Sequence, residues 1–522
     1  HSGKLGVRID EGPHMEVTPL GDGRACYVAL NVDLDTAKKE LRSQVFKEYN
    51  GEERHSPRMI PILTNFIKKA TVFCNILVSC IILKQGITSL FLLIVSAKNY
   101  TFYKLSIIIV IIVKFSILST NMEHKGILYI SYDGILEPLG QSQVLSYLEK
   151  LSQKRAVHLI SFEKPSDKKN KHLFDRVSKR INNSNIHWHP LTYHKKPTMI
   201  ATLWDIFCAT VLGSWLILKH NLKVVHARSY VASVSALVLK KIFSIQYIFD
   251  MRGFWVDERV DGEIWSRNSY LFRVGKKLEK NFLLNADIVI SLTHKAVKEM
   301  EKFTYLQGKN PRFEVITTCT DLDLFKPSNI KNKERPLTVG YVGSVGVWYL
   351  FEEALDCYQM IKKIIPNARL HILNKGGHDY INNCLNNKGI DKKFVLIETK
   401  DHSGVVSTMQ SIDVGLFMIK PLYSKISSMP TKLGEFLGCG VPCICNSGIG
   451  DMDDIINNEK VGIVLNSFEK KEKEKGILSL LELIKDPTVK TRCREAALKH
   501  FSLIDGVNSY NNIYSFLDVK PQ

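Results

Sequence analysis

The sequence predicts an α/β protein built from two domains, each with a parallel β-sheet covered by helices on both faces. Short apolar runs alternate with longer amphipathic stretches from residue 122 onward, as parallel sheets require. A polar, proline-flanked segment at 320–336 interrupts the alternation once. The length of 522 residues also exceeds what one hydrophobic core usually organises.

The apolar runs before the interruption predict the strands of the first domain, at 126–131, 156–162, 223–227, 245–250, 287–291 and 313–317. A second series predicts strands at 337–342, 369–373, 394–397, 413–417, 442–445 and 461–464. Parallel sheets bind ligands beyond the carboxyl ends of their strands, so two facing sheets predict a cleft between domains. The expected domains are 122–325 and 326–500, with a helix at 501–522 returning to the first domain.

Residues 1–121 are an N-terminal extension of uncertain structure. From 71 to 118 the chain is strongly apolar, in three runs that are each shorter than the roughly 20 residues that span a bilayer. One interpretation is one or two tilted membrane helices with lysines that reach the interface. The other is a fragment of a different protein or an upstream extension of the reading frame, with Met122 as the natural initiator. Both interpretations stay open.

Composition narrows the function classes. The net charge of +19 suits nucleic acid, an anionic membrane surface or a phosphorylated substrate equally well. The basic residues are scattered in short runs typical of solvated surfaces, which disfavours nucleic acid as a partner. Eleven cysteines with irregular spacing argue against a disulfide framework and for a reducing compartment.

The stretch SSMPTKLGEFLGCGVPCI, residues 427–444, concentrates candidate binding residues. A buried strand and a polar loop precede it, and Pro430 is suited to the first turn of a helix. Backbone N–H groups at this helix N-terminus, with Lys432 and with Lys420 or Lys425, offer an anion site suited to a diphosphate. Glu435, one turn in, can accept two hydrogen bonds from a vicinal diol such as ribose. The alternative makes Glu435 an ordinary surface residue and the glycines close-packing points.

Further candidates follow predicted strands of both domains. Gly140 and Gln141 open the first helix, where N–H groups can face a phosphate or sugar, and a plain turn is the alternative. His226 ends a buried strand and is either a cleft residue or structural. The remaining candidates are Arg252, Trp255 and Asp257, which suit acceptor binding or an internal ion pair, and Gly376, where the backbone can approach a nucleotide.

One resemblance joins these motifs. Residues 434–442, GEFLGCGVP, followed by NSGIGD at 446–451, resemble the nucleotide-sugar site of the family 4 retaining glycosyltransferases, which have the two-domain GT-B fold with Rossmann-like domains. The similarity extends over essentially all of residues 122–522. The other segments that carry it, in chain order, are 131–151, 224–230, 277–293, 321–327 and 340–349.

The resemblance implies roles for particular residues. Glu435 would hold the donor ribose, and His226 would touch the sugar and its developing charge, so these two form the expected catalytic pair. Two departures matter: Ser427 stands where the family often has a glutamate, and the loop at 343–348 lacks the arginine and lysine that often neutralise the diphosphate. With the three lysines taking over from the missing basic pair, the donor-binding residues expected from the sequence are Gly343, Ser344, Gly376, Lys420, Lys425, Ser427, Ser428, Thr431, Lys432 and Glu435.

The implied activity is transfer of a hexosyl or related sugar from a nucleotide diphosphate sugar to a hydroxyl, with retention. No metal or other cofactor is required by this scheme, since the helix N-terminus and lysine supply positive charge. The implied partners are a nucleotide sugar, a saccharide or lipid-linked acceptor in bacterial-type surface polysaccharide or glycolipid synthesis, and a membrane surface. The expected location is cytoplasmic, at the inner face of the membrane.

Rival functions fit parts of the same pattern. A nucleotide-sugar epimerase or a phosphorylase can be built on the same fold, although no pyridoxal-binding lysine is identifiable. A non-catalytic, membrane-tethered nucleotide-sugar binding protein would keep the apolar segment 71–118. A nicotinamide oxidoreductase is disfavoured, because no GxGxxG follows the first strand of either domain.

Overall fold

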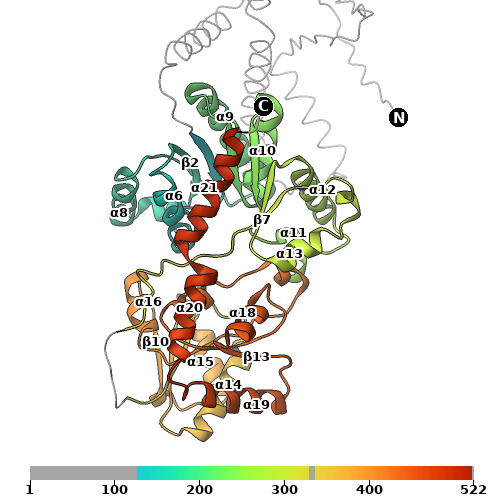
Figure 1. Ribbon diagram of the computed structural model, residues 1–522. Helices are drawn as coiled ribbons and strands as arrows, with labels where there is room; N and C mark the ends of the chain where they lie inside the picture. The colour runs from blue at the N-terminus through green and yellow to red at the C-terminus, as the bar shows by residue number, and fades with distance from the viewer. Residues whose placement is uncertain (1–125, 329–334, 520–522) are drawn as a thin grey trace, which may run out of the picture. The chain divides into compact units, whose positions relative to one another are not determined.

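The chain from residue 126 to 519 forms two parallel β-sheets with helices on both faces, in a computed structural model that describes residues 126–328 and 335–519 (Figure 1). The predicted α/β class is therefore confirmed. The expectations for residues 1–121, including the apolar segment 71–118, lie outside the described residues. The domain boundaries expected from the sequence stay predictions.

The first sheet has seven strands in the order β3-β2-β1-β4-β5-β6-β7, and each neighbouring pair is parallel. Its order reverses between β1 and β4, where Ser131 pairs with Arg228 at the strand ends. Such a switch point is where open α/β sheets place their ligands. The strands are β1 Ile127–Ser131, β2 Val157–Glu163, β3 Ile186–Thr192, β4 Val224–Arg228, β5 Gln246–Asp250, β6 Ile288–Ser291 and β7 Phe313–Val315.

Apolar side chains on the two faces of this sheet form two separate hydrophobic cores. On one face Leu128 and Phe249 pack with helices α9, α10 and α12. On the other, Tyr129 and Ile248 pack with α6, α8 and the C-terminal helix α21. The helices are α5 Pro138–Gly140, a π-helical turn Gln141–Leu145, α6 Ser146–Leu151, α7 Pro165–Lys169, α8 Lys171–Asn182, α9 Thr198–His220, α10 Ser229–Phe243, α11 Trp255–Asp261, α12 Tyr270–Asn285, α13 His294–Met300 and η2 Thr304–Leu306.

The second sheet has six parallel strands in the order β10-β9-β8-β11-β12-β13. Its strands are β8 Thr338–Val342, β9 Arg369–Leu373, β10 Val395–Glu398, β11 Val414–Leu416, β12 Cys443–Asn446 and β13 Gly462–Leu465. Its helices are α14 Phe351–Ile364, α15 His378–Asn387, η3 Lys392–Phe394, α16 His402–Met409, η4 Tyr423–Ser427, α17 Thr431–Gly438, α18 Met452–Glu459, α19 Lys470–Leu483 and α20 Val489–Phe501. Helices α14, α15 and α19 pack on one face, and α17, α18 and α20 on the other.

Every strand predicted from the sequence is present, with ends that differ by at most two residues. The prediction missed β3, whose sequence is IHWHPLT. Two histidines and a proline interrupt the apolar run that a buried strand would show. β3 lies at the edge of the sheet, where a proline inside a strand is tolerated because one side has no hydrogen-bonded neighbour.

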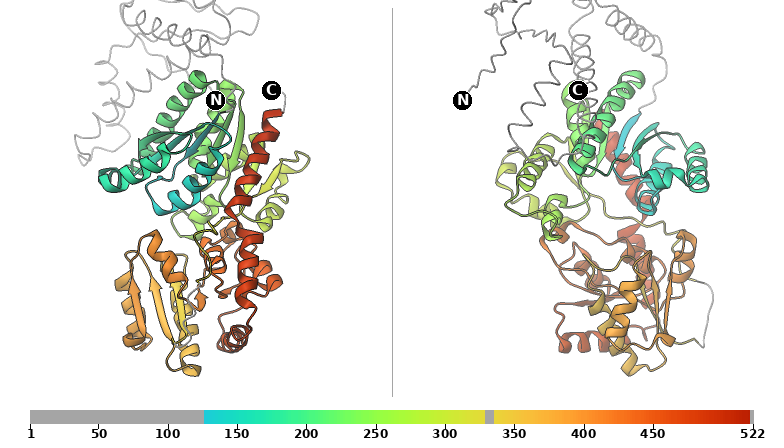
Figure 2. Two further views of the ribbon diagram at one scale, coloured as in Figure 1. Left: turned by 60° about the vertical axis from the view of Figure 1, so that its left-hand side comes forward. Right: turned by 180° about the vertical axis from the view of Figure 1, so that it is seen from behind.

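The C-terminal helix α21 (Leu503–Val519) follows α20 of the second domain and packs on the first sheet (Figure 2). Its Tyr514 hydroxyl lies 2.7 Å from Nδ1 of His226, and Gln246 donates a hydrogen bond to the Leu517 carbonyl. At the crossing point Thr320 and Ser502 form a parallel β-bridge. The linker and the returning helix therefore lie side by side.

Helix α17 lies against this crossing because two of its residues are glycine. A Cβ atom on Gly434 would come 2.6 Å from the Thr320 hydroxyl and 2.9 Å from the Phe501 ring. A Cβ atom on Gly438 would come 2.9 Å from the Phe325 carbonyl oxygen. Glycines one turn apart thus let the helix approach the linker and α20 closely, and this close approach explains the two glycines.

We expect Gly434→Ala to lower the free energy of unfolding by about 1 to 3 kcal/mol, because the added methyl group overpacks the contact with Thr320 and Phe501. Thermal unfolding of the full chain measures the change. Lys475→Ala, at an exposed position of α19, is the matched control and should stay within about 0.5 kcal/mol. Equal midpoints for both variants would contradict the close approach.

Candidate functional site

Helix α17 carries two ionisable side chains that the fold removes from bulk water. Lys432 is only 6% exposed, and its Nζ atom has no hydrogen-bond partner among the described residues. The ammonium lies 4.1 Å from the centre of the Tyr349 ring, with the Tyr341 and Phe417 rings at 5.5 Å. Burial lowers the pKa of Lys432 to about 7, against the opposing effect of Glu435. A buried cation without a hydrogen-bond acceptor is suited to an incoming anion.

Glu435 lies one turn further along α17, partly buried, and lines a cleft. Burial raises the pKa of its carboxyl to about 7, although the Lys432 charge acts in the opposite direction. No described residue donates a hydrogen bond to this carboxylate. Its oxygens are therefore available to accept hydrogen bonds from a ligand. Perturbed pKa values caused by burial beside a charged partner are typical of functional sites.

The backbone beside Lys432 is shaped by Gly343, which follows strand β8. Its φ of +117° is a conformation that favours glycine, and a Cβ atom there would come 3.0 Å from Nζ of Lys432. The Gly343 carbonyl accepts a hydrogen bond from the Asn374 side chain, so the ends of β8 and β9 are tied together. The predicted residue Ser344 accepts a hydrogen bond from Tyr341 through its carbonyl. Gly376, with φ of +93°, has open space where its Cβ would be.

The cleft that Glu435 lines has a volume of about 940 Å³ and draws residues from both domains. On the second domain these follow strands β9 and β10, and on the first they follow β1 and β2 or lie on α8. The polar and charged residues around it include both signs, which suits a ligand with a diphosphate and several hydroxyls. Among them are Gln141, Lys164, Arg176, Lys375, Thr399 and Lys400.

The loop before α17 binds the first domain rather than the cleft. Lys425 is buried and its Nζ lies 2.7 Å from the Glu258 carboxylate and 4.0 Å from the centre of the Trp348 ring. Ser427 accepts a hydrogen bond from the Phe254 N–H group through its hydroxyl. These two predicted donor residues therefore already have partners. Of the others, Lys420 is exposed, and Ser428 and Thr431 are partly buried. Glu435 is the one member of the ten predicted donor residues that lines the cleft, and Lys432 lies behind it on the same helix.

Of the two predicted residues that open the first helix, one lines the cleft. Gln141 does so and donates a hydrogen bond to the Leu136 carbonyl. Gly140 is buried, and a Cβ atom there would come 2.0 Å from the Gly134 carbonyl oxygen. This position therefore requires glycine because the preceding loop crosses it closely.

His226 differs from its expected position. The sequence placed it at a strand end facing the cleft, but the strand continues to Arg228 and the imidazole is fully buried. Its Nδ1 lies 2.7 Å from the Tyr514 hydroxyl of α21, and its Nε2 lies 3.6 Å from the Asp250 carboxylate. Burial lowers the pKa of His226, so it is neutral near neutral pH. The C-terminal helix covers the ring, and the sequence alone did not indicate that this helix packs against this strand.

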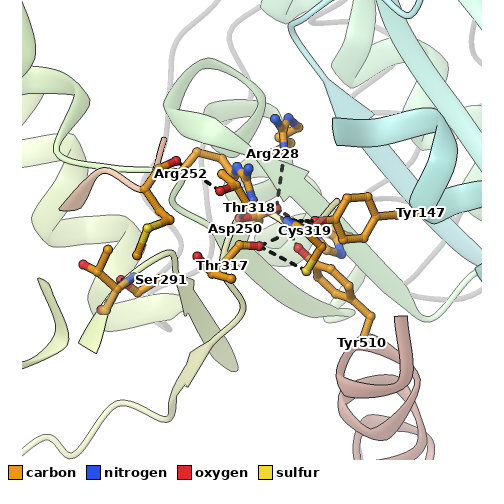
Figure 3. A network of polar contacts seen from close by, with 12 residues as sticks. Tyr147, Arg228, Asp250, Arg252, Ser291, Thr317, Thr318, Cys319 and Tyr510 are labelled. Atoms are coloured by element: carbon orange, nitrogen blue, oxygen red, sulfur yellow. Dashed lines mark hydrogen bonds and ion pairs between the residues drawn. The ribbon is translucent and has the colours of Figure 1, made fainter. Parts of the chain in front are cut away.

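Arg228 occupies the strand end that was expected for His226, and it belongs to a buried polar network (Figure 3). The Arg228 and Arg252 guanidinium groups each lie 3.9 Å from the Asp250 carboxylate, and Tyr510 of α21 donates a hydrogen bond to it. Burial alone would raise the pKa of Asp250, but the two arginines and His226 hold it below its ordinary value. Arg252 has a φ of +58°, and such strain in a non-glycine residue is typical of functional sites.

The last two predicted cleft residues are engaged inside the first domain. Trp255 contacts the Tyr230 and Trp265 rings and lies under the Arg259 guanidinium. Asp257 is buried, and its carboxylate lies 2.9 Å from Nζ of Lys276. Neither lines the cleft. Within residues 126–328 and 335–519, no three His, Cys, Asp or Glu side chains are grouped to hold a metal ion.

Sequence reasoning missed Arg228 and the aromatic surroundings of Lys432. A signal for Arg228 existed, since it follows the apolar run at 223–227 directly and the last residue of a parallel strand faces the ligand edge. The rings of Tyr341, Tyr349 and Phe417 come from three separate segments, and only the folded chain brings them to one lysine.

Residues 324–500 match a family model described as "Glycosyl transferases group 1". No curated protein matches the chain. These 177 residues include helix α17 and the second-domain part of the cleft.

The fold is shared with solved structures of other proteins. Sucrose-phosphate synthase from Thermosynechococcus elongatus superposes with a TM-score of 0.58 at 15% identity, covering 76% of this chain and 99% of that chain. A glycosyltransferase from Rickettsia africae gives 0.55 at 15% identity over 77% and 100%. The Anabaena protein HepE, in complex with UDP and glucose, gives 0.55 at 13% identity over 75% and 100%. The expected GT-B fold is thus confirmed, while assignment to family 4 stays a prediction.

We expect Lys432→Met to raise the free energy of unfolding by about 1 to 4 kcal/mol, because methionine packs against the three rings without a desolvated charge. The pKa of Lys432 is lower in the folded protein, about 7, than in the unfolded chain, so the wild type gains stability as pH rises above 7. The advantage of the variant should therefore be largest below about pH 7 and shrink toward about pH 10.

Thermal unfolding across this pH range measures the difference. Lys475→Met, on the exposed face of α19, serves as the control and should show no such pH dependence. A loss of stability in Lys432→Met would mean that the lysine has a structural partner, contrary to the site described above.

Proposed function

We propose that this chain, which carries a glycosyltransferase group 1 domain over residues 324–500, transfers a sugar from a nucleoside diphosphate sugar to a hydroxyl acceptor. The observation that carries the proposal is the pair on α17: a buried lysine that has no hydrogen-bond partner in the described part of the chain, one turn from a carboxylate that opens to the cleft. A glycosyltransferase needs both chemistries at one place, a cation for the diphosphate and an acceptor for the ribose hydroxyls.

The donor site is proposed as follows. Lys432 binds the diphosphate together with N–H groups at the start of α17, and Glu435 accepts two hydrogen bonds from the ribose diol. The base lies toward Lys375, Thr399 and Lys400, which follow β9 and β10. UDP is the first nucleotide to test, because the similar Anabaena structure contains UDP and glucose. Lys432 thereby takes the role of the basic pair that the loop at 343–348 lacks.

The proposed reaction retains the anomeric configuration, as the resemblance to family 4 implies. The departing diphosphate gains charge while the sugar becomes oxocarbenium-like, so a preorganised Lys432 ammonium stabilises the leaving group. Arg228, rather than His226, ends strand β4 at the switch point of the first sheet, where it is buried beside the Asp250 carboxylate.

The acceptor is proposed to be a saccharide or a lipid-linked saccharide in surface polysaccharide or glycolipid synthesis, at the cytoplasmic face of a membrane. The basic charge of +19 and the apolar segment 71–118 support this class. An epimerase of the same fold would need the same donor site, so the product decides between them. A binding protein would hold the nucleotide sugar without consuming it.

The first experiment is a thermal-shift screen of the full chain against nucleoside diphosphates, UDP first. At a ligand concentration of about 100 Kd, binding should stabilise the chain by about 2.7 kcal/mol. Glu435→Gln keeps the shape of the side chain but loses the charge, and should abolish most of the shift. Glu482→Gln, an exposed glutamate on α19, should keep it. No shift with any nucleotide, from a cooperatively melting protein, would overturn the proposal.

Catalysis is tested by incubating the full chain with the stabilising nucleotide's sugar. A glycosyltransferase should slowly hydrolyse the donor in the absence of an acceptor, releasing a sugar of unchanged configuration at its other carbons. An epimerized sugar would support the epimerase instead, and an unconsumed donor would support the binding protein. Glu435→Gln should remove the hydrolysis, whereas Glu482→Gln should not.

Binding of the nucleotide sugar should also change the number of protons bound to the protein, with uptake at high pH and release at low pH. A bound diphosphate favours the charged form of Lys432, and ribose hydroxyls favour the ionised form of Glu435. At about pH 8 Lys432 is mostly neutral and Glu435 already ionised, so binding takes up a proton. At about pH 6 the reverse holds, and binding releases one. Calorimetry in buffers of different ionisation enthalpy, with UDP-glucose, measures both; no proton exchange at either pH would contradict the assignment.

A further inference from the structure

Helix α9 (Thr198–His220) exposes large apolar side chains at both ends of the face that points away from the sheet. It is long and apolar enough by composition to cross a membrane, and no other helix in the described part of the chain is. Its inner face, with Ala209, Gly213 and Leu216, packs on the first sheet and on α10. A helix held on a sheet in this way does not span a bilayer, so its outer face needs another explanation.

Large apolar side chains are exposed at both ends of that outer face. Near the start of α9, Met199 is 58% and Leu203 is 54% exposed. Near its end, Trp215 is 39% and Leu218 is 44% exposed. Such residues, spread along one helix of a folded chain, mark an interaction surface.

Charge on and around α9 is of one sign. The helix contains a single acidic residue, Asp205, which is fully buried and bonded to His194 and Tyr132. Exposed lysines flank the apolar face at both ends, and Lys219 lies 4.5 Å from the centre of the Trp215 ring. The flanking lysines are Lys195, Lys196, Lys219 and Lys223. Apolar residues with tryptophan, bordered by lysines, are typical of helices that lie in the interface of an anionic membrane.

The position of α9 in the chain supports the same partner. The apolar run that ends at residue 118 is followed, after residues 119–125, by Gly126 and strand β1. Strand β1 starts at the amino edge of the first sheet, and the His220 ring at the end of α9 contacts the His158 ring near the start of β2 at that same edge. The chain therefore enters the first domain at the edge where the end of α9 lies.

We propose that the outer face of α9, with Met199, Leu203, Trp215 and Leu218, docks on the surface of an anionic lipid bilayer. The helix lies flat, its apolar side chains enter the acyl boundary, and its flanking lysines contact lipid phosphates. The start of α9 is at the carboxyl edge of the sheet, which carries the ligand end of β1, so this docking also brings the cleft edge near the membrane. The docking itself does not depend on the proposed transfer activity.

The first test is co-sedimentation of the full chain with vesicles of phosphatidylethanolamine and phosphatidylglycerol, compared with phosphatidylcholine alone. The double variant Leu203→Glu with Leu218→Glu should bind anionic vesicles at least tenfold more weakly, since a charged side chain replaces an apolar one at each end of α9. The matched control, Leu478→Glu with Leu498→Glu, changes leucines of similar exposure on α19 and α20 and should bind like the wild type. Equal loss in both pairs would overturn the proposal.

If residues 1–121 alone bind the chain to vesicles, the Leu203→Glu and Leu218→Glu double variant will sediment like the wild type. A second measurement tests α9 directly in that case. Vesicles with brominated acyl chains quench tryptophan that reaches the acyl boundary. Quenching should occur in the wild type and fall in Trp215→Phe, but not in Trp265→Phe. Absence of quenching from Trp215 on bound vesicles would overturn the proposal and would mean that another part of the chain covers α9.

Discussion

The structure around the cleft depends on one constraint: a short helix holds Lys432 and Glu435 one turn apart, with the lysine buried and the glutamate partly buried at the cleft. Burial lowers the pKa of Lys432 and raises that of Glu435, and neither charge has a hydrogen-bond partner within residues 126–328 and 335–519. Leaving such groups unpaired is costly for folding. Their arrangement is therefore best explained by a ligand that supplies a diphosphate and a diol.

The rest of the fold holds this helix in place. Two glycines of α17 let it approach the linker at Thr320 and the end of α20, and α21 then returns to the first sheet. The loop before α17 is bound to the first domain through Lys425 and Ser427. The proposed donor residues and the interdomain contacts thus share one segment, so we expect binding at α17 to depend on the relative position of the domains. Closure of such a cleft excludes water from a reactive donor.

Sequence patterns predicted much of this fold, because buried parallel strands read as continuous apolar runs. They missed β3, since an edge strand with histidines and Pro190 lacks that signature. Lys432 and Glu435 were predicted because helix starts and charged residues are local features. The misplacement of His226 had a non-local cause: its neighbours are Tyr510 and Tyr514 of a helix almost 290 residues away in the chain. The aromatic rings around Lys432 could not be predicted either, because they come from segments that are far apart in the sequence.

The most direct measurement is a crystal structure of the full chain with bound UDP. We expect the diphosphate to lie within hydrogen-bond distance of Nζ of Lys432, with both ribose hydroxyls donating to the Glu435 carboxylate. We also expect the base to lie toward Lys375 and Lys400. A nucleotide bound elsewhere, with Lys432 still unpaired among its aromatic rings, would contradict the central assignment.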